Sequence, residues 1–226
     1  MASAFSWSDW QFSDKGCAVF IALVALGLWR SRTIAPHWLW WVNGFLVLLV
    51  LCSPLQTDSM SSYSAHMAEH LVVILILAPI AVWSWKPRGL QQSLSLLGFF
   101  GYVIVIPLYH LTSLGGLIMR STGAQDIELF IFAAIGVAFW LGPCGSYFTR
   151  SQRTTYIALA LPISIFTGVA LTSLTRVPFT LEPMPGMALT LSDLHQGGQV
   201  MAVLSSCLLI VHVLWSALSS KPSMRI

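Results

Sequence analysis

Seven apolar stretches, each long enough to cross a lipid bilayer, divide this chain and leave short segments between them. A spanning helix needs about 20 apolar residues. The predicted spans are residues 12–29, 38–55, 63–85, 92–114, 124–143, 154–174 and 192–218. Only 8% of the residues are charged, whereas soluble domains carry roughly 25%. Because backbone polar groups in lipid must be paired within the protein, we expect an all-α fold: one membrane domain over residues 1–226, built as a seven-helix bundle.

The basic residues predict how this bundle is oriented. Eight of the 11 Lys and Arg residues follow an odd-numbered span: Arg30, Arg32, Lys86, Arg88, Arg150, Arg153, Lys221 and Arg225. Basic residues gather in cytoplasmic segments, so the C-terminus is predicted to be cytoplasmic and the N-terminus outside. The same orientation places all 8 acidic residues on the outer side. The net charge of +3 is small and scattered, which excludes a nucleic-acid partner.

A pair of histidines, His66 and His70, stands where a Ser-rich polar segment enters the third predicted span. Residues four apart share one face of a helix, and Glu69 lies beside them. Ionisable side chains within a membrane are costly unless they bind or pair with something, so they mark candidate functional sites. The alternative interpretation is two solvated histidines, or histidines satisfied by backbone groups.

Further groups able to bind a metal ion gather on the same predicted side. Imidazole suits zinc, copper, iron and nickel, and thioether sulfur selects Cu(I), so the sequence predicts a copper or zinc site. The predicted ligands are the outer-side histidines His66, His70, His110 and His195. Carboxylates that could orient the imidazole rings are Glu69, Asp126, Glu128 and Asp193. Possible sulfur ligands are Met67, Met201, Cys17 and Cys52, with buried inert thiols as the alternative for the cysteines.

Other function classes remain open from these residues alone. Two histidines on facing helices could ligate a haem, which would make the chain an electron-transfer subunit. A purely structural accessory subunit of a respiratory complex is a second alternative. An ion-conducting protein is disfavoured, because the inner halves of the third, fifth and seventh predicted spans offer almost no polar groups. The chain shows no motif for a catalytic nucleophile or for phosphate binding, so it is not predicted to be an enzyme.

Three segments resemble the CtaG family of assembly factors for caa-type cytochrome c oxidase. One is His66-Met67-Ala68-Glu69-His70, which runs into an apolar stretch ending at Pro79. The others are Leu108-Tyr109-His110 with residues 139–143 (FWLGP), and residues 193–201 (DLHQGGQVM), where Gly197-Gly198 also predicts close helix packing. The resemblance covers essentially the whole chain. It departs at residues 125–129 (QDIEL), where the family usually has a second His-x-x-Glu-His.

The resemblance implies a function linked to copper. The chain would be a divergent member that lies in a bacterial inner membrane and binds copper at the outer face. It would then assist assembly or metallation of a respiratory oxidase or another cuproprotein. Its partners would be the lipid bilayer and a client such as an oxidase subunit or a copper carrier. Residues 125–129 keep Glu128 but lack both family histidines, which implies a reduced or altered site that His195 could complete.

Overall fold

The computed structural model is helical throughout the regular elements that it describes. It describes residues 41–42, 44–47, 50, 62–85, 91–112, 114–115, 122–145, 147–178 and 190–218. Within these ranges, five helices are long and apolar enough to cross a membrane: Tyr63–Ser84, Gln92–Leu111, Gly123–Cys144, Arg150–Thr172 and Leu191–Leu218. They agree with the last five predicted spans to within a few residues.

The first two predicted spans are not tested in the same way. Residues 12–29 lie outside the described ranges, and within 38–55 only residues 41–42, 44–47 and 50 are described, all of them helical. The count of seven spans and the orientation of the two termini therefore stay predictions. The end of the bundle at which Tyr63–Ser84 begins and Gln92–Leu111 ends is called the outer end, after the predicted orientation.

Two of the spanning helices are interrupted by a π-helical segment. In chain order the elements are α4 (Tyr63–Val72), η2 (Val73–Leu77), α5 (Ala78–Trp85), α6 (Gln91–Phe100), η3 (Gly101–Val105), α7 (Ile106–Leu111), α9 (Thr122–Cys144), α10 (Arg150–Thr172) and α11 (Leu191–Leu218). The wider turns of a π-helix leave backbone carbonyls short of partners. In η2, the Ile74 carbonyl accepts from Trp140 Nε1 at 2.8 Å and the Leu75 carbonyl accepts from His212 Nε2 at 3.0 Å. These bonds satisfy backbone groups that lipid could not.

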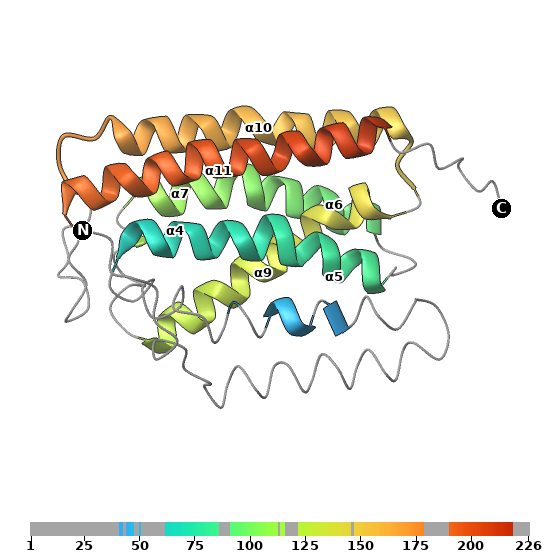
Figure 1. Ribbon diagram of the computed structural model, residues 1–226, viewed down its shortest axis with the longest axis horizontal. Coiled ribbons are helices and arrows are strands. Elements are labelled where there is room, and N and C mark those ends of the chain that lie inside the picture. The colour runs from blue at the N-terminus through green and yellow to red at the C-terminus, as the bar shows by residue number, and fades with distance from the viewer. Residues whose placement is uncertain are drawn as a thin grey trace.

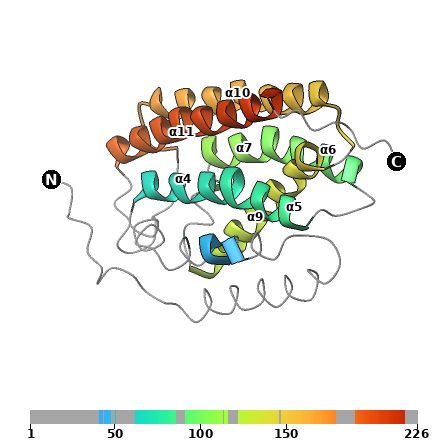
Figure 2. The same ribbon diagram turned by 45° about the vertical axis from the view of Figure 1, so that its right-hand side comes forward.

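The helix formed by α4, η2 and α5 is the central one in the described part of the bundle. Helix α11 packs against both α10 and α4, and α9 packs against α6 and α5. Figures 1 and 2 both show α10 and α11 side by side on one side of α4 and α5, with α9 crossing the line of α4 and α5 obliquely. Of the apolar stretch of 18 residues within Tyr63–Ser84, 67% is buried inside the structure. The corresponding share for Leu191–Leu218 is 22%. The histidine pair is thus carried by the best enclosed helix.

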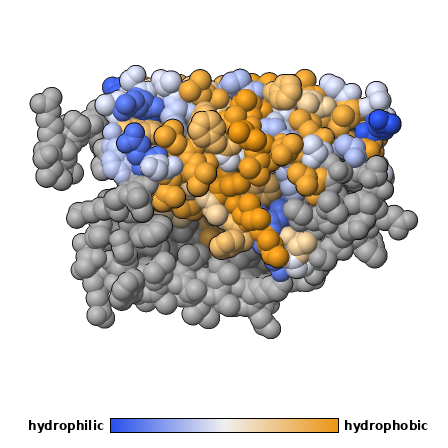
Figure 3. Space-filling model, turned by 180° about the vertical axis from the view of Figure 1, so that it is seen from behind, coloured by the Kyte–Doolittle hydropathy of each residue, from blue (hydrophilic) through white to orange (hydrophobic). Residues whose placement is uncertain are grey.

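The exposed surface of the described helices suits a lipid environment. Large apolar side chains point outward on three different helices, such as Phe130 (74% exposed), Phe166 (62%) and Val203 (64%). Figure 3 shows hydrophobic residues across the middle of one face, with hydrophilic residues gathered toward its two ends. In water this much apolar surface would cause association, so the structure is that of a membrane protein.

Glycines allow α10 and α11 to approach closely. A Cβ atom placed on Gly168 would lie 2.5 Å from the carbonyl oxygen of Gly198, and one on Gly198 would lie 2.7 Å from the carbonyl oxygen of Gly168. Small residues at such crossings let helix backbones meet in a membrane. The close packing predicted from Gly197-Gly198 is confirmed. A Cβ on Gly197 would likewise lie 2.6 Å from the Tyr63 ring, so α11 fits tightly against α4.

The carboxylate of Asp193 on α11 holds the first turn of α4. Its Oδ2 accepts from the backbone N–H of Tyr63 at 2.6 Å, and its Oδ1 accepts from the backbone N–H of Ser64 at 3.2 Å. The hydroxyls of Ser62 and Ser64 also donate to Oδ1, at 3.0 and 2.7 Å. The first N–H groups of a helix lack partners within it, and a carboxylate there also offsets the helix dipole. Asp193 therefore fixes where α4 begins and how it sits against α11.

We expect Asp193→Ala to lower the free energy of unfolding by about 1–3 kcal/mol, because it leaves helix N–H groups unpaired. The measurement is the thermal unfolding midpoint of the protein in detergent. Ser192→Ala, an exchange at an exposed neighbouring position on the same helix, is the control and should leave the midpoint unchanged. Equal midpoints for the two variants would show that the Asp193 contacts contribute nothing to stability.

Candidate metal centre

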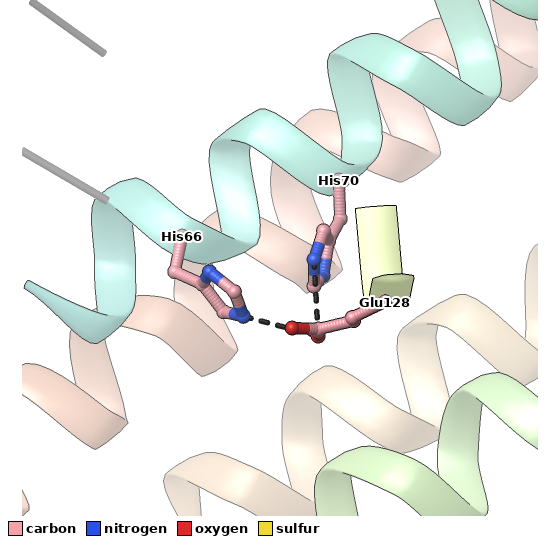
Figure 4. Close-up of polar contacts among 3 residues, drawn as sticks. All are labelled: His66, His70 and Glu128. Carbon is pink, nitrogen blue, oxygen red and sulfur yellow. Dashed lines mark hydrogen bonds and ion pairs between the residues drawn. The ribbon is translucent and has the colours of Figure 1, made fainter. Parts of the chain in front are cut away.

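Two histidines of α4 and a glutamate of α9 converge near the outer end of the bundle. His66, His70 and Glu128 each offer one ligand atom, and these atoms all lie within 4.8 Å of one another. Glu128 Oε1 is 3.1 Å from His66 Nε2 and 3.2 Å from His70 Nε2. The histidine side chains are 3% exposed and the glutamate side chain 2%. In Figure 4 both imidazole rings point from α4 toward the Glu128 carboxylate.

The two imidazole rings lie together because of the helical spacing within α4, whereas the Glu128 carboxylate reaches them because α9 crosses the helix formed by α4, η2 and α5. The four-residue spacing stacks His66 and His70 one turn apart on one face of α4, with ring centroids 4.2 Å apart and the planes at 61°. Glu128 lies 62 residues from His66 in the sequence, in the second turn of α9, and accepts a hydrogen bond from His66 Nε2. A carboxylate can only accept, so in this state Nε2 of His66 carries the proton.

His110 lies beside this cluster but outside the set of three. It lies one residue before the end of the spanning helix that α7 completes, and its side chain is buried. Its ring centroid is 5.7 Å from that of His70, and it stacks on Phe132 at 5.9 Å and 11°. Its Nδ1 atom makes no hydrogen bond in the structure. The structure therefore brings three of the four predicted histidine ligands to one region.

The fourth predicted ligand, His195, is engaged elsewhere. Its Nε2 donates to the backbone carbonyl of Leu174 at 2.8 Å, which joins the start of α11 to the segment after α10. Asp193, predicted to orient a histidine ring, instead receives hydrogen bonds from the first turn of α4. Asp126 is exposed on α9. Glu69 is buried on α4 and interacts electrostatically with His66.

The two described sulfur candidates belong to the packing between α4 and its neighbours. Met67 is 1% exposed, and its Cγ would lie 3.2 Å from a Cβ placed on Gly197 of α11. Met201 is a buried residue of α11 in the same apolar core. Cys17 and Cys52 lie outside the described residues.

The chemistry of this ligand set suits a transition-metal ion. Imidazole nitrogens bind copper, zinc, iron and nickel, and a carboxylate adds an oxygen donor and a negative charge. Several buried polar atoms here make no hydrogen bond within the described part of the chain: His70 Nδ1, His110 Nδ1 and Glu128 Oε2. An unpaired buried polar atom costs free energy, and a membrane offers no water to repair it. The residues present therefore fit a bound cation.

Gln125 is a buried polar residue of α9 that was not among the predicted ligands, although it begins the segment 125–129 in which the resemblance implied an altered site. Gln125 is 8% exposed, and neither its Oε1 nor its Nε2 makes a hydrogen bond in the structure. It precedes Glu128 by three residues, so the two share one face of α9. The three-residue spacing of Gln125 and Glu128 could be seen in the sequence. The burial of the Gln125 amide, near the end of a predicted span, could not.

A family-level comparison agrees with the resemblance seen in the sequence. The family model described as cytochrome c oxidase caa3 assembly factor matches residues 20–220. Comparisons with curated proteins and with solved structures gave no match. The matched range contains His66, His70, His110, Gln125 and Glu128.

Proposed function

Because this chain belongs to the family of cytochrome c oxidase caa3 assembly factors, we propose that it assists oxidase assembly by binding copper at the His66–His70–Glu128 centre. It would pass the ion to an oxidase subunit, a copper carrier or another cuproprotein at the outer face of a bacterial inner membrane. The role is that of an accessory protein rather than an enzyme. Copper is its cargo and not a resident cofactor.

The observation that carries this proposal is the convergence of three donor atoms in an apolar interior. His66 and His70 are 2% and 3% exposed, and Glu128 is 2% exposed. A carboxylate and two imidazoles in such a place are costly unless they pair with one another or bind an ion. Both histidines contact the same carboxylate oxygen, Oε1, so neither of them uses Oε2 of Glu128.

Each residue of the centre has a distinct part in holding the ion. His66 and His70 would bind through Nε2, the atoms that already face Glu128, as neutral imidazoles in the tautomer that carries its proton on Nδ1. Glu128 supplies the negative charge that offsets the cation. His110 is the available further donor from α7, because its ring lies next to that of His70 and its Nδ1 is unbonded. The bound ion supplies the metal that the client centre needs.

The location of the centre supports transfer at one membrane face. His66 lies in the first turns of the span that begins at Tyr63, and Glu128 lies five residues into the span that begins at Gly123. His110 is one residue from the end of the span Gln92–Leu111. All three therefore lie near the outer end of the bundle, where a client outside the cytoplasm could reach the ion.

The test is the copper content of the purified protein, together with oxidase assembly in cells. Wild type is expected to bind copper in a stoichiometric amount, and His66→Ala/His70→Ala should lose it and fail to support oxidase assembly. His195→Ala is the matched comparison, since His195 lies outside the cluster and bonds to Leu174; it should keep its copper.

Three other outcomes would revise this function. If His195→Ala loses as much copper as His66→Ala/His70→Ala, His195 is a copper ligand, as the sequence alone predicted. A haem absorption band in the wild type would favour the electron-transfer alternative. Wild-type protein that binds neither copper nor haem, yet supports assembly, would leave a purely structural role.

A further inference from the structure

Gln125 stands out among the buried residues of α9 because its side-chain amide has no hydrogen-bond partner among the residues that the structure describes. It is 8% exposed, and both Oε1 and Nε2 lack a hydrogen-bond partner. Buried amides in folded proteins are nearly always hydrogen-bonded. Leaving one unpaired costs free energy that an apolar side chain of similar size would avoid. A glutamine here therefore implies a partner that is bound only part of the time.

The position of Gln125 relates that partner to the metal centre. Helix α9 begins at Thr122, so Gln125 lies between the start of the helix and Glu128. Residues three apart on a helix are neighbours on one face. Both side chains are buried, and Oε2 of Glu128, like the amide of Gln125, makes no hydrogen bond. One face of α9 thus carries two oxygen donors in succession from the outer end inward.

A copper ion that enters from outside needs donor groups on its way to the buried histidines. His66 and His70 are almost fully enclosed, so an ion from outside must shed its water before it reaches them. Oxygen donors placed along the way can replace that water stepwise. An amide oxygen is a neutral and harder donor than imidazole, and copper prefers imidazole nitrogen. An amide oxygen therefore binds copper more weakly than the histidines do, and the ion can move on from it to them.

We propose that Gln125 forms, with Glu128, the outer half of the copper site: its Oε1 receives the ion first and passes it to His66 and His70. This inference rests on the proposed function and adds to it the side from which the ion enters. Gln125 acts on the rate of copper uptake and release, while Glu128 and the two histidines determine the affinity.

The test compares Gln125→Leu with wild type in three measurements on the detergent-purified full chain. The first is the rate of copper uptake, followed by stopping the reaction with a copper chelator at timed intervals. Parallel runs with and without ascorbate offer both oxidation states of copper. The second is equilibrium affinity by chelator competition, and the third is the thermal unfolding midpoint. Gln199→Leu, the same exchange at an exposed position of α11, is the control.

We expect Gln125→Leu to take up copper about tenfold more slowly, while its equilibrium affinity falls by less than the roughly 10–100-fold that is typical when a ligand-orienting group is lost. Its unfolding midpoint should be unchanged or higher, since an unpaired buried amide has been removed. Gln125→His, which retains a donor atom, should take up copper quickly and release it more slowly. Gln199→Leu should match wild type in uptake and affinity.

The outcomes separate this inference from the function it rests on. If wild type binds copper and Gln125→Leu takes it up at the wild-type rate, the role of Gln125 is wrong and the proposed function stands. A lower midpoint with equal losses in rate and affinity would make Gln125 a structural residue and overturn the inference. If wild type binds no copper in either oxidation state, both proposals fail together.

Discussion

Replacing Glu128 by alanine is expected to remove copper binding more completely than any other single substitution in the centre. Glu128 contacts both histidines of the three-residue ligand set, at 3.1 and 3.2 Å, and its carboxylate is the charge in that set. Loss of a group that only orients a ligand typically lowers metal affinity about 10–100-fold, and loss of a ligand should exceed this. The measurement is copper affinity by chelator competition.

Asp126→Ala is the control for this prediction, because it removes the same charge from the same helix at an exposed position. It should leave copper affinity within about twofold, since an exposed charge is screened by solvent. Glu128→Gln keeps the shape of the side chain and loses its charge, so it should fall between wild type and Glu128→Ala. Wild-type affinity in Glu128→Ala would remove Glu128 from the site and require another donor.

Replacing Gly98 by alanine is expected to have the largest effect on stability. A Cβ at this position of α6 would lie 2.1 Å from the backbone nitrogen of Phe139 and 2.3 Å from the carbonyl carbon of Ala138. Both atoms belong to the α9 backbone and cannot turn aside, so the two helices must separate. We expect the free energy of unfolding to fall by about 3 kcal/mol or more, measured as the unfolding midpoint in detergent and the yield of folded protein in the membrane.

Gly123→Ala is the control for Gly98→Ala, because it makes the same substitution at a position where the added methyl group has room. A Cβ on Gly123, in the first turn of α9, would meet nothing within 4 Å. Alanine is favoured over glycine in a helix by about 0.5–1 kcal/mol, so this variant should be as stable as wild type or slightly more so. A Gly98→Ala protein with the midpoint of Gly123→Ala would show that α6 and α9 do not pack as closely as the structure has them.

The membrane spans were largely predictable because their signal is local. Length and apolar composition predict a spanning helix without reference to the rest of the chain, and the described helices agree with the last five predicted spans. The π-helical segments at Val73–Leu77 and Gly101–Val105 were not predicted. They depend on partners such as Trp140, which lies 66 residues from the Ile74 carbonyl to which it donates.

The candidate site was predicted in part, because only part of its geometry follows from local sequence spacing. The pairing of His66 with His70 follows from helical spacing alone, and the structure shows it. The family assignment drawn from short motifs is confirmed by the match over residues 20–220. Copper itself stays a proposal, as do the roles of the individual ligands.

The sequence by itself determined a membrane bundle of apolar helices, one of which presents two histidines on a single face near its end. Only the tertiary structure decided that Glu128 meets those histidines while His195 bonds to Leu174 and Asp193 to the start of α4. The physical reason is that a helix repeats every 3.6 residues whatever surrounds it. The meeting of two helices depends instead on side-chain volume at their crossing, as at Gly98 against α9 and at Gly168 against Gly198.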